Sequence, residues 1–212
     1  MKQPNILFIT TDEQHMRTLT CYGSKAGVTP VLDTLAQNSD VYEQAYTVSP
    51  VCLPARCAFM TGMYPHHSGS VSNVFGASVS RSYPNLFTEL KKQGYITALH
   101  GKCHFIPVPY PATRRDMTLE YEHFMTYYRS LGMDKLSLQD DKNNSLWYYD
   151  DYAKELSRRG MLKKCRYEAH EKPDNPGYYD FPFSSDMHPD AWVAQKAIED
   201  IRSRSTKEPN FL

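Results

Sequence analysis

A cysteine and an arginine four residues apart, with a proline between them, form the stretch best suited to chemistry, C-L-P-A-R from Cys52 to Arg56. Pro54 lacks an N–H and has a fixed φ, which suits the first turn of a helix, and Gly62 is a typical helix end. Cys52 would then lie at the helix N-terminus, where unpaired N–H groups favour an anion, with Arg56 one turn further along. The pattern predicts a site for a tetrahedral oxyanion ester. A cysteine that packs as a small hydrophobic side chain is the alternative.

A pair of acids follows the first apolar run of the chain. Residues 5–10 favour a β-strand, and Asp12 and Glu13 come shortly after it. In an open α/β sheet, ligands bind at the carboxyl ends of the strands, and carboxylate oxygens suit a hard cation such as Ca²⁺ or Mg²⁺. The pair is therefore a candidate metal site, with a solvated turn or a helix cap as the alternative.

Two segments, in the same order and at the same spacing, resemble the type I sulfatases. The first is C-x-P-x-R, followed by a small-residue helix and T-G. The second lies about fifty residues later and reads G-Y-x-T-x-x-x-G-K-x-H from Gly94 to His104. Taken alone, this second segment is a basic loop with a surface histidine. Weaker matches to the family are the strand before Asp12, the segment that begins at Thr29, and Y-P-x-x-x-G from Tyr64.

The resemblance implies a catalytic role for four residues. In the family the cysteine is oxidised by a formylglycine-generating enzyme, so Cys52 would become formylglycine, whose hydrated aldehyde attacks the sulfur of a sulfate ester. Arg56 and Lys102 would offset the charge of the sulfuryl oxygens, and Lys102 would bind the sulfate. His104 would contact the formylglycine and assist its turnover. We therefore expect a sulfuric ester hydrolase that acts on an aryl sulfate or a sulfated carbohydrate.

The resemblance also implies a divalent cation, usually Ca²⁺, with Mg²⁺ as a possible replacement. Asp12, Glu13 and residue 52 would be its ligands, although the family more often has aspartate where Glu13 stands. Because Ca²⁺ takes roughly six to eight oxygen ligands, these residues are too few. The family supplies the remaining ligands and a second lysine from a later strand, so we expect this N-terminal portion to be inactive alone.

Three other functions stay open on the sequence. A related hydrolase of the same superfold could act on phosphate or phosphonate esters. A non-catalytic relative could bind sulfated glycans without cleaving them. An enzyme could also use the Cys52 thiol directly, and thiol alkylation would then inactivate it.

The strands and helices that must position these residues can be predicted from the sequence. Their pattern indicates an α/β fold, with a mostly parallel sheet flanked by helices. By resemblance this fold is alkaline phosphatase/sulfatase-like and incomplete at its C-terminus. Helices are predicted over residues 29–36, 54–61, 84–94, 119–131, 144–159 and 189–204, and strands over 5–10, 41–47, 96–99 and 208–212.

The chain is predicted to be the N-terminal portion of one catalytic domain. Residues 1–105 would form its core, 106–188 an aromatic-rich insertion that contacts the substrate, and 189–212 a return helix and the start of the next strand. The adjacent His66 and His67 are predicted to be surface or substrate-rim residues, because neighbours on a chain rarely point at one metal ion.

The composition argues against several classes of partner. The chain has 24 basic and 24 acidic side chains, so no net field recruits nucleic acid or an anionic membrane. Five cysteines without paired C-x-x-C motifs argue against a disulfide framework and a zinc ribbon, and all except Cys52 are predicted to be buried or incidental thiols. The first apolar run is too short for a signal or a membrane span. The sequence as written predicts a cytoplasmic protein, or a periplasmic or secreted one if a leader was removed.

Overall fold

The computed structural model describes residues 3–73, 78–105, 121–140, 149–165, 181–204 and 208–212. The chain forms two compact units, one made of Met1–Leu7 and Val48–Leu212 and the other of Phe8–Thr47. Within the described ranges, no helix has the length and apolar character that a membrane span requires. The smaller unit contains α1 (Pro30–Gln37) and the 3-10 helices η1 (Met16–Thr18) and η2 (Thr20–Tyr22). The larger unit begins with α2 (Cys52–Thr61), α3 (Pro65–Ser68) and α4 (Leu86–Lys92).

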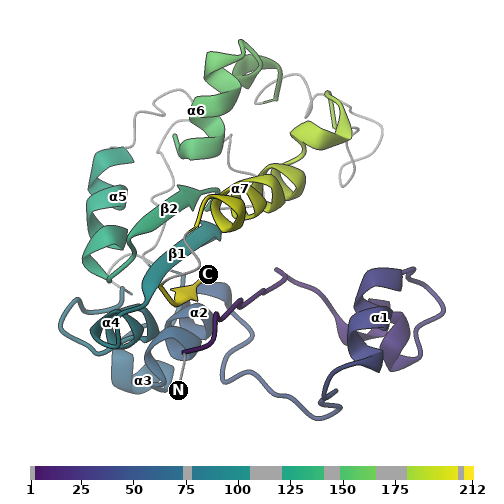
Figure 1. Ribbon diagram of the computed structural model, residues 1–212, viewed down its shortest axis with the longest axis horizontal. Helices are drawn as coiled ribbons and strands as arrows, with labels where there is room; N and C mark the ends of the chain where they lie inside the picture. The colour runs from purple at the N-terminus through teal and green to yellow at the C-terminus, as the bar shows by residue number, and fades with distance from the viewer. Residues whose placement is uncertain (1–2, 74–77, 106–120, 141–148, 166–180, 205–207) are drawn as a thin grey trace. The chain divides into compact units, whose positions relative to one another are not determined.

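The larger unit is organised around a parallel sheet with the strand order β2-β1-β3 (Figure 1). The middle strand β1 (Ile96–Gly101) pairs with β2 (Lys135–Leu138) on one side and β3 (Asn210–Phe211) on the other. Parallel neighbours need long crossover connections. The described parts of these crossovers contain α5 (Tyr121–Ser130), α6 (Asp151–Arg158), the 3-10 helix η4 (Ser185–Met187) and α7 (Pro189–Ser203). The predicted α/β class, a parallel sheet flanked by helices, is confirmed.

Local sequence signals set the ends of several helices. Gly62 ends α2 with a φ of 71°, a left-handed conformation that glycine adopts without strain. A capping box begins α4, because Asn85 Oδ1 accepts the N–H of Thr88 at 3.1 Å and Thr88 Oγ1 accepts the N–H of Asn85 at 3.1 Å. Asp150 caps α6 by accepting the N–H of Ala153 at 2.7 Å.

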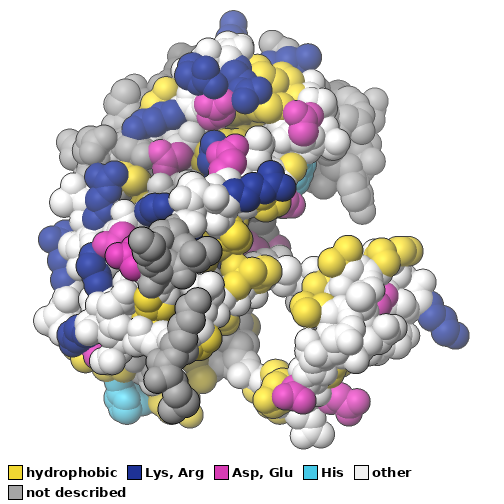
Figure 2. All heavy atoms as spheres, in the orientation of Figure 1, with side chains coloured by type: hydrophobic (Ala, Val, Ile, Leu, Met, Phe, Trp, Pro, Cys, Tyr) yellow, Lys and Arg dark blue, Asp and Glu magenta, His cyan; other side chains and the backbone are white. Residues whose placement is uncertain are grey.

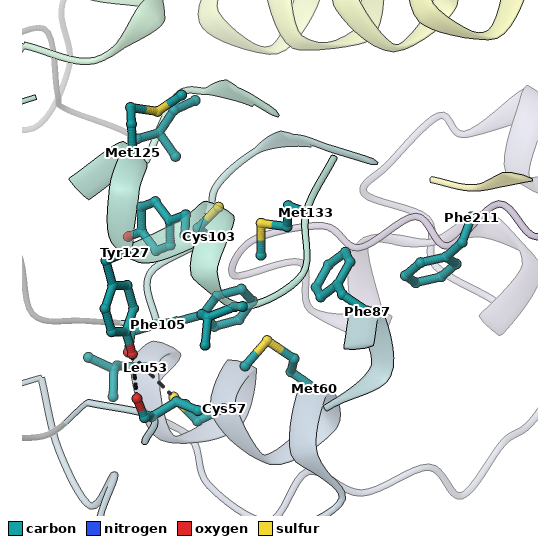
Figure 3. Close-up of a cluster of buried hydrophobic side chains, with 14 of the residues drawn as sticks. Leu53, Cys57, Met60, Phe87, Cys103, Phe105, Met125, Tyr127, Met133 and Phe211 are labelled. Atoms are coloured by element: carbon teal, nitrogen blue, oxygen red, sulfur yellow. Dashed lines mark hydrogen bonds between the residues drawn. The ribbon is translucent and has the colours of Figure 1, made fainter. Parts of the chain in front are cut away.

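Two hydrophobic clusters form the core of the larger unit. The first packs α2, α4 and α5 together with the sheet, and Figure 3 shows Phe105, which follows β1, close to Met60 of α2. In the same cluster the rings of Phe87 and Phe211 lie 5.3 Å apart between their centroids. The second cluster joins α6 to η4 and α7 and consists of Tyr152, Leu156, Cys165, Met187 and Trp192. The first cluster thus buries the face of α2 that carries Leu53, Cys57 and Met60.

A buried polar cluster attaches α7 to the sheet. Asp200 of α7 accepts hydrogen bonds from Lys135 Nζ at 2.6 Å and Arg204 Nε at 2.9 Å, and its Oδ2 lies 3.2 Å from His100 Nε2. Arg204 also donates to Asn210 Oδ1 at 2.9 Å, so the cluster reaches all three strands. Burial alone would raise the pKa of Asp200, but the hydrogen bonds from Arg204, Lys135 and His100 outweigh it and hold the pKa below its usual value.

Basic side chains gather over α6 (Figure 2). Arg158 and Arg159 bond to Glu155 at 2.8 and 2.7 Å, and these hydrogen bonds lower the pKa of Glu155 to about 2. Lys164 Nζ lies 5.7 Å from the ring centroid of Phe183. Since the two arginines are largely exposed, their ion pairs contribute little to stability.

Two of the predicted strands are wrong. Residues 5–10 pair with the sheet only at Ile6, which forms a single parallel bridge with Phe211. Because β3 is only two residues long, the described residues offer this segment backbone partners around Ile6 alone. Residues 41–47 are irregular and exposed, and the smaller unit to which they belong has no strand in its described residues. A β-favouring run does not form a strand without a neighbour that satisfies its backbone.

The predicted helices are confirmed within a few residues at most ends. The helix predicted over 144–159 begins later, at Asp151, because Asp150 provides its cap. Residues 141–148, together with 106–120 and 166–180 of the predicted substrate region, lie outside the described residues. The division of the chain at residues 105 and 188 therefore stays a prediction.

Replacing Asp200 tests the attachment of α7. Asp200→Asn removes the charge opposite the buried guanidinium of Arg204, whose side chain is 6% exposed. An uncompensated buried charge is costly, so we expect the free energy of unfolding to fall by about 3 kcal/mol in urea titrations. The control is Glu199→Gln, which breaks the exposed pair with Lys196 and should leave the free energy of unfolding nearly unchanged. Equal losses in the two variants would contradict the proposed importance of Asp200.

The pH dependence of stability tests the burial of His100. Burial lowers the pKa of His100, and the hydrogen bond to Asp200 opposes this shift without cancelling it. As the pH falls below about 6.5, the unfolded state therefore binds a proton that the folded state does not, and stability decreases. Urea unfolding between pH 8 and 5 should show this loss, and His100→Gln should reduce its slope. An unchanged slope in the variant would contradict this assignment.

Candidate active site

Cys52 is the first residue of α2, as the sequence predicted for a residue at a helix N-terminus. Val51 precedes the helix in an extended conformation, and its carbonyl accepts the N–H of Ala55 at 3.0 Å. Cys52 is half-buried, so its side chain retains access to solvent. The first turn of a helix has N–H groups without helical partners and the positive end of the helix dipole. The position suits a residue that meets an anionic group.

Asn73 contacts this helix N-terminus and was not predicted from the sequence. Its Oδ1 accepts the N–H of Leu53 at 3.0 Å, and its Nδ2 donates to Cys52 Sγ at 3.1 Å. One amide therefore caps the first turn of α2 and orients the side chain of residue 52. Because Asn73 is exposed, it lies at the solvent side of the site rather than in the core.

Arg56 connects the two motifs that the sequence singled out. It lies one turn after Cys52 and is buried, with 8% of its surface exposed. Its Nη1 donates to the carbonyl oxygen of Lys102 at 2.7 Å. The C-x-P-x-R helix and the G-K-x-H segment therefore meet in one place, although 46 residues separate the two bonded groups.

Lys102 and His104 stand in the turn that follows the carboxyl end of β1. The strand ends at Gly101, whose φ of 105° favours glycine and whose Cβ position would lie 3.1 Å from Val193 Cγ1. Lys102 and His104 are half-buried, whereas Cys103 between them is fully buried. His104 has a positive φ of 50°, which is uncommon for a residue with a side chain. The turn therefore has a defined, unusual conformation.

Two of the other cysteines, Cys57 and Cys103, are unsuited to nucleophilic chemistry. All five cysteines lie within the described residues, and none forms a disulfide. Burial raises the pKa of Cys57 to about 11, and it raises the pKa of Cys103 well above its usual value. Both stay protonated at neutral pH and act as small apolar side chains. Cys165 is buried and Cys21 half-buried, so the prediction of buried or incidental thiols agrees with the structure.

Asp12 and Glu13 belong to the smaller unit, and both are exposed there. Their carboxylates are the oxygen donors that a hard cation such as Ca²⁺ or Mg²⁺ takes, so their chemistry fits the predicted metal. Within the described ranges, no group of three or more His, Cys, Asp or Glu side chains is arranged to hold a metal ion. The metal site over Asp12, Glu13 and Cys52 stays a prediction.

His66 and His67 lie on the short helix α3, and both side chains are exposed. Their ring centroids are 4.1 Å apart, and the ring of His66 also stacks on Tyr64 at 5.7 Å. This exposure agrees with the prediction that both histidines are surface residues.

The chain resembles solved structures over nearly its whole length. The crystal structure of a phosphonate monoester hydrolase from Agrobacterium radiobacter matches with a TM-score of 0.73 and 22% identity, over 99% of this chain and 40% of that one. This likeness identifies the fold as the alkaline-phosphatase-like α/β fold, in which the site lies at the carboxyl ends of parallel strands.

A model of the sulfatase family matches residues 4–212, so the chain belongs to the sulfatase family. An arylsulfatase from Clostridium perfringens is 27% identical, over 99% of this chain and 42% of its own length. An N-acetylglucosamine-6-O-sulfatase from Bacteroides thetaiotaomicron is 34% identical over 109 residues, which cover 51% of this chain and 19% of that protein. The chain therefore spans less than half the length of either relative.

Two replacements of Asn73 test its contact with α2. Asn73→Ala removes the acceptor for the N–H of Leu53, so we expect the free energy of unfolding to fall by about 1 kcal/mol. Asn73→Asp keeps an acceptor oxygen and adds a negative charge near the helix N-terminus, so it should leave stability at or above the wild-type value. Urea unfolding measures both. Equal destabilisation by the two variants would contradict the capping role.

Proposed function

We propose that the protein containing this chain hydrolyses sulfate esters. The observation that carries the proposal is the 2.7 Å hydrogen bond from Arg56 Nη1 to the carbonyl oxygen of Lys102. It holds a guanidinium from α2 beside the turn that contains a second cation, next to the helix N-terminus of Cys52. Two cations and a helix N-terminus together favour a tetrahedral anion. Membership of the sulfatase family supports a sulfate ester as that anion.

Each residue of the site would have a role that follows from its chemistry. Arg56 and Lys102 bind the sulfuryl oxygens and offset the negative charge that they carry as the ester bond breaks. His104 lies two residues after Lys102 in the same turn and is half-buried, which suits a group that holds or delivers a proton at an imidazole nitrogen. Asn73 orients the side chain of residue 52 through its Nδ2.

Residue 52 would supply the nucleophile after its conversion from cysteine to formylglycine. In formylglycine the Cβ atom of residue 52 is the aldehyde carbon. The Sγ atom of Cys52 therefore marks the position that oxygen takes in the mature residue. When formed, formylglycine supplies a hydrated aldehyde whose hydroxyl is a nucleophile at neutral pH. Half-burial at the start of α2 leaves Cys52 accessible in the folded chain. A formylglycine-generating enzyme is the partner that this maturation requires.

A divalent cation, Ca²⁺ or Mg²⁺, would complete the site. Asp12, Glu13 and residue 52 would hold it, and the cation would supply further positive charge for the sulfuryl oxygens. Since Ca²⁺ takes roughly six to eight oxygen ligands, additional donors are required. The cation is therefore proposed as a component of the whole protein.

A sulfated carbohydrate or an aryl sulfate is the proposed substrate class. The 34% identical relative is an N-acetylglucosamine-6-O-sulfatase, which supports a sulfated sugar. A relative matched over 99% of this chain is an arylsulfatase, which supports an aryl sulfate as a convenient assay substrate.

The test is a parallel assay of the whole protein, produced together with a formylglycine-generating enzyme, on an aryl sulfate and the matching aryl phosphate. We expect faster turnover of the sulfate, and a peptide mass at residue 52 that matches the aldehyde or its hydrate. Arg56→Ala should lower kcat/KM by roughly 10²–10³-fold, because it removes a charge that stabilises the transition state. Arg81→Ala, which removes an exposed arginine stacked on Tyr127, is the control and should leave kcat/KM unchanged.

Three results would contradict the proposal. Faster turnover of the phosphate would indicate a phosphate or phosphonate ester hydrolase of the same fold. Binding of sulfated glycan without turnover, with residue 52 mature, would indicate a binding protein. An unmodified Cys52 together with inactivation by thiol alkylation would indicate a thiol enzyme.

A further inference from the structure

We propose that Asp140 is a positioning residue that holds the Lys102–His104 turn in its reactive conformation. The inference rests on the proposed function, because it assigns Lys102 and His104 to the sulfate site. Asp140 follows β2, as the turn follows β1, so both lie beyond the carboxyl ends of neighbouring parallel strands. No motif in the sequence marks this residue.

The carboxylate of Asp140 binds the backbone of the turn directly. Its Oδ1 accepts the N–H of Cys103 and the N–H of His104, each at 2.7 Å. Its Oδ2 accepts the hydroxyl of Tyr128 at 2.7 Å. Asp140 is fully buried, with 0% of its surface exposed, so it cannot meet a substrate from solvent. It would act only through the groups that it holds.

These two amide bonds account for the unusual backbone of His104. A residue at positive φ directs successive N–H groups toward the same side, which makes a small anion-binding concavity. His104 has a φ of 50°, and the N–H groups of residues 103 and 104 converge on one oxygen. A residue with a side chain is strained in this conformation, and the hydrogen bonds to the carboxylate offset that strain. Without the carboxylate, the turn would relax and carry Lys102 and His104 away from their places.

The carboxylate is itself fixed by two helices. Tyr128 belongs to α5, and its ring packs edge-on against Phe105 with centroids 6.2 Å apart. The N–H of Asp140 donates to Asp150 Oδ2 at 3.2 Å, while Asp150 Oδ1 caps α6 through the N–H of Ala153. Because α5 and α6 both anchor Asp140, the turn cannot shift without disturbing these helices.

Double-mutant cycles in the whole, matured protein separate positioning from a merely structural role. Asp140→Ala should lower kcat/KM for the aryl sulfate by about 100-fold, as expected when reacting groups are misplaced by about 1 Å. In a Lys102→Ala background, the same change should cost distinctly less than about 100-fold, because only the misplacement of His104 remains to lower the rate. An equal loss in both backgrounds would overturn the proposal.

Conservative variants keep the proposal testable if Asp140→Ala does not fold. Asp140→Asn retains one oxygen for the two N–H groups and can turn its amide toward the Tyr128 hydroxyl, so it should retain activity within about tenfold of wild type. Tyr128→Phe removes one of the three hydrogen bonds and should cause a smaller loss than Asp140→Ala. A loss from Asp140→Asn as large as that expected from Asp140→Ala would overturn the proposal.

Amide hydrogen exchange tests the inference independently of any activity. Asp140→Ala should accelerate exchange at the amides of Cys103 and His104 relative to the amides of β1. Asp134→Ala is the matched control, because Asp134 Oδ2 accepts the N–H of Thr97 at 3.1 Å, near the end of β1 that lies away from the turn. If wild type fails to hydrolyse sulfate esters, the proposed function falls, and this exchange pattern still supports the positioning role. Unchanged exchange at both amides in folded Asp140→Ala would overturn it.

Discussion

The hydrogen bond between the Arg56 guanidinium and the Lys102 carbonyl is the contact on which the candidate site depends. Arg56 has 8% of its surface exposed, so its guanidinium must be satisfied by acceptors within the protein, and one of them comes from a turn 46 residues away. The bond fixes the distance between α2 and the end of β1. Leu53 and Met60 of α2 belong to the same hydrophobic cluster as Phe105, which directly follows the turn, so apolar packing acts at the same junction. Core packing and site geometry therefore reinforce each other.

The parallel sheet explains why residues so distant in sequence share a site. Lys102 and His104 follow β1, Asp140 follows β2, and the two strands are paired in register up to Gly101 and Leu138. Parallel strands bring their carboxyl ends to one edge, where their loops meet. The sheet must also hold α7, and the bonds of Asp200 to Lys135, Arg204 and His100 provide this attachment. One polar cluster of the sheet, around Asp200, therefore serves folding, and another, around Asp140, serves the candidate site.

The sequence predicted the residues whose function depends on local spacing. Cys52 and Arg56 are four residues apart on one helix, and Lys102 and His104 lie in one turn, so their proximity could be inferred without a structure. Asn73 could not, since its contact with residue 52 spans 21 positions and its surroundings carry no periodic pattern. Asp140 was missed for the same reason. The strands predicted over 5–10 and 41–47 failed because β-propensity does not specify a partner.

The buried arginines Arg204 and Arg56 differ in the group that accepts their hydrogen bonds. Arg204, with a side chain 6% exposed, bonds to the carboxylate of Asp200, so its charge is matched within the fold. Arg56 is buried to a similar extent, but its acceptor at 2.7 Å is the neutral carbonyl of Lys102. This neutral acceptor orients the guanidinium and joins α2 to the turn. Asp140 holds the same turn through hydrogen bonds from two backbone amides and accepts a third from the phenol of Tyr128. Burial raises the pKa of the Asp140 carboxyl, while the charge of Lys102 acts to lower it. The turn is therefore fixed by contacts to its backbone, which leaves the positions of its side chains dependent on the groups that hold that backbone.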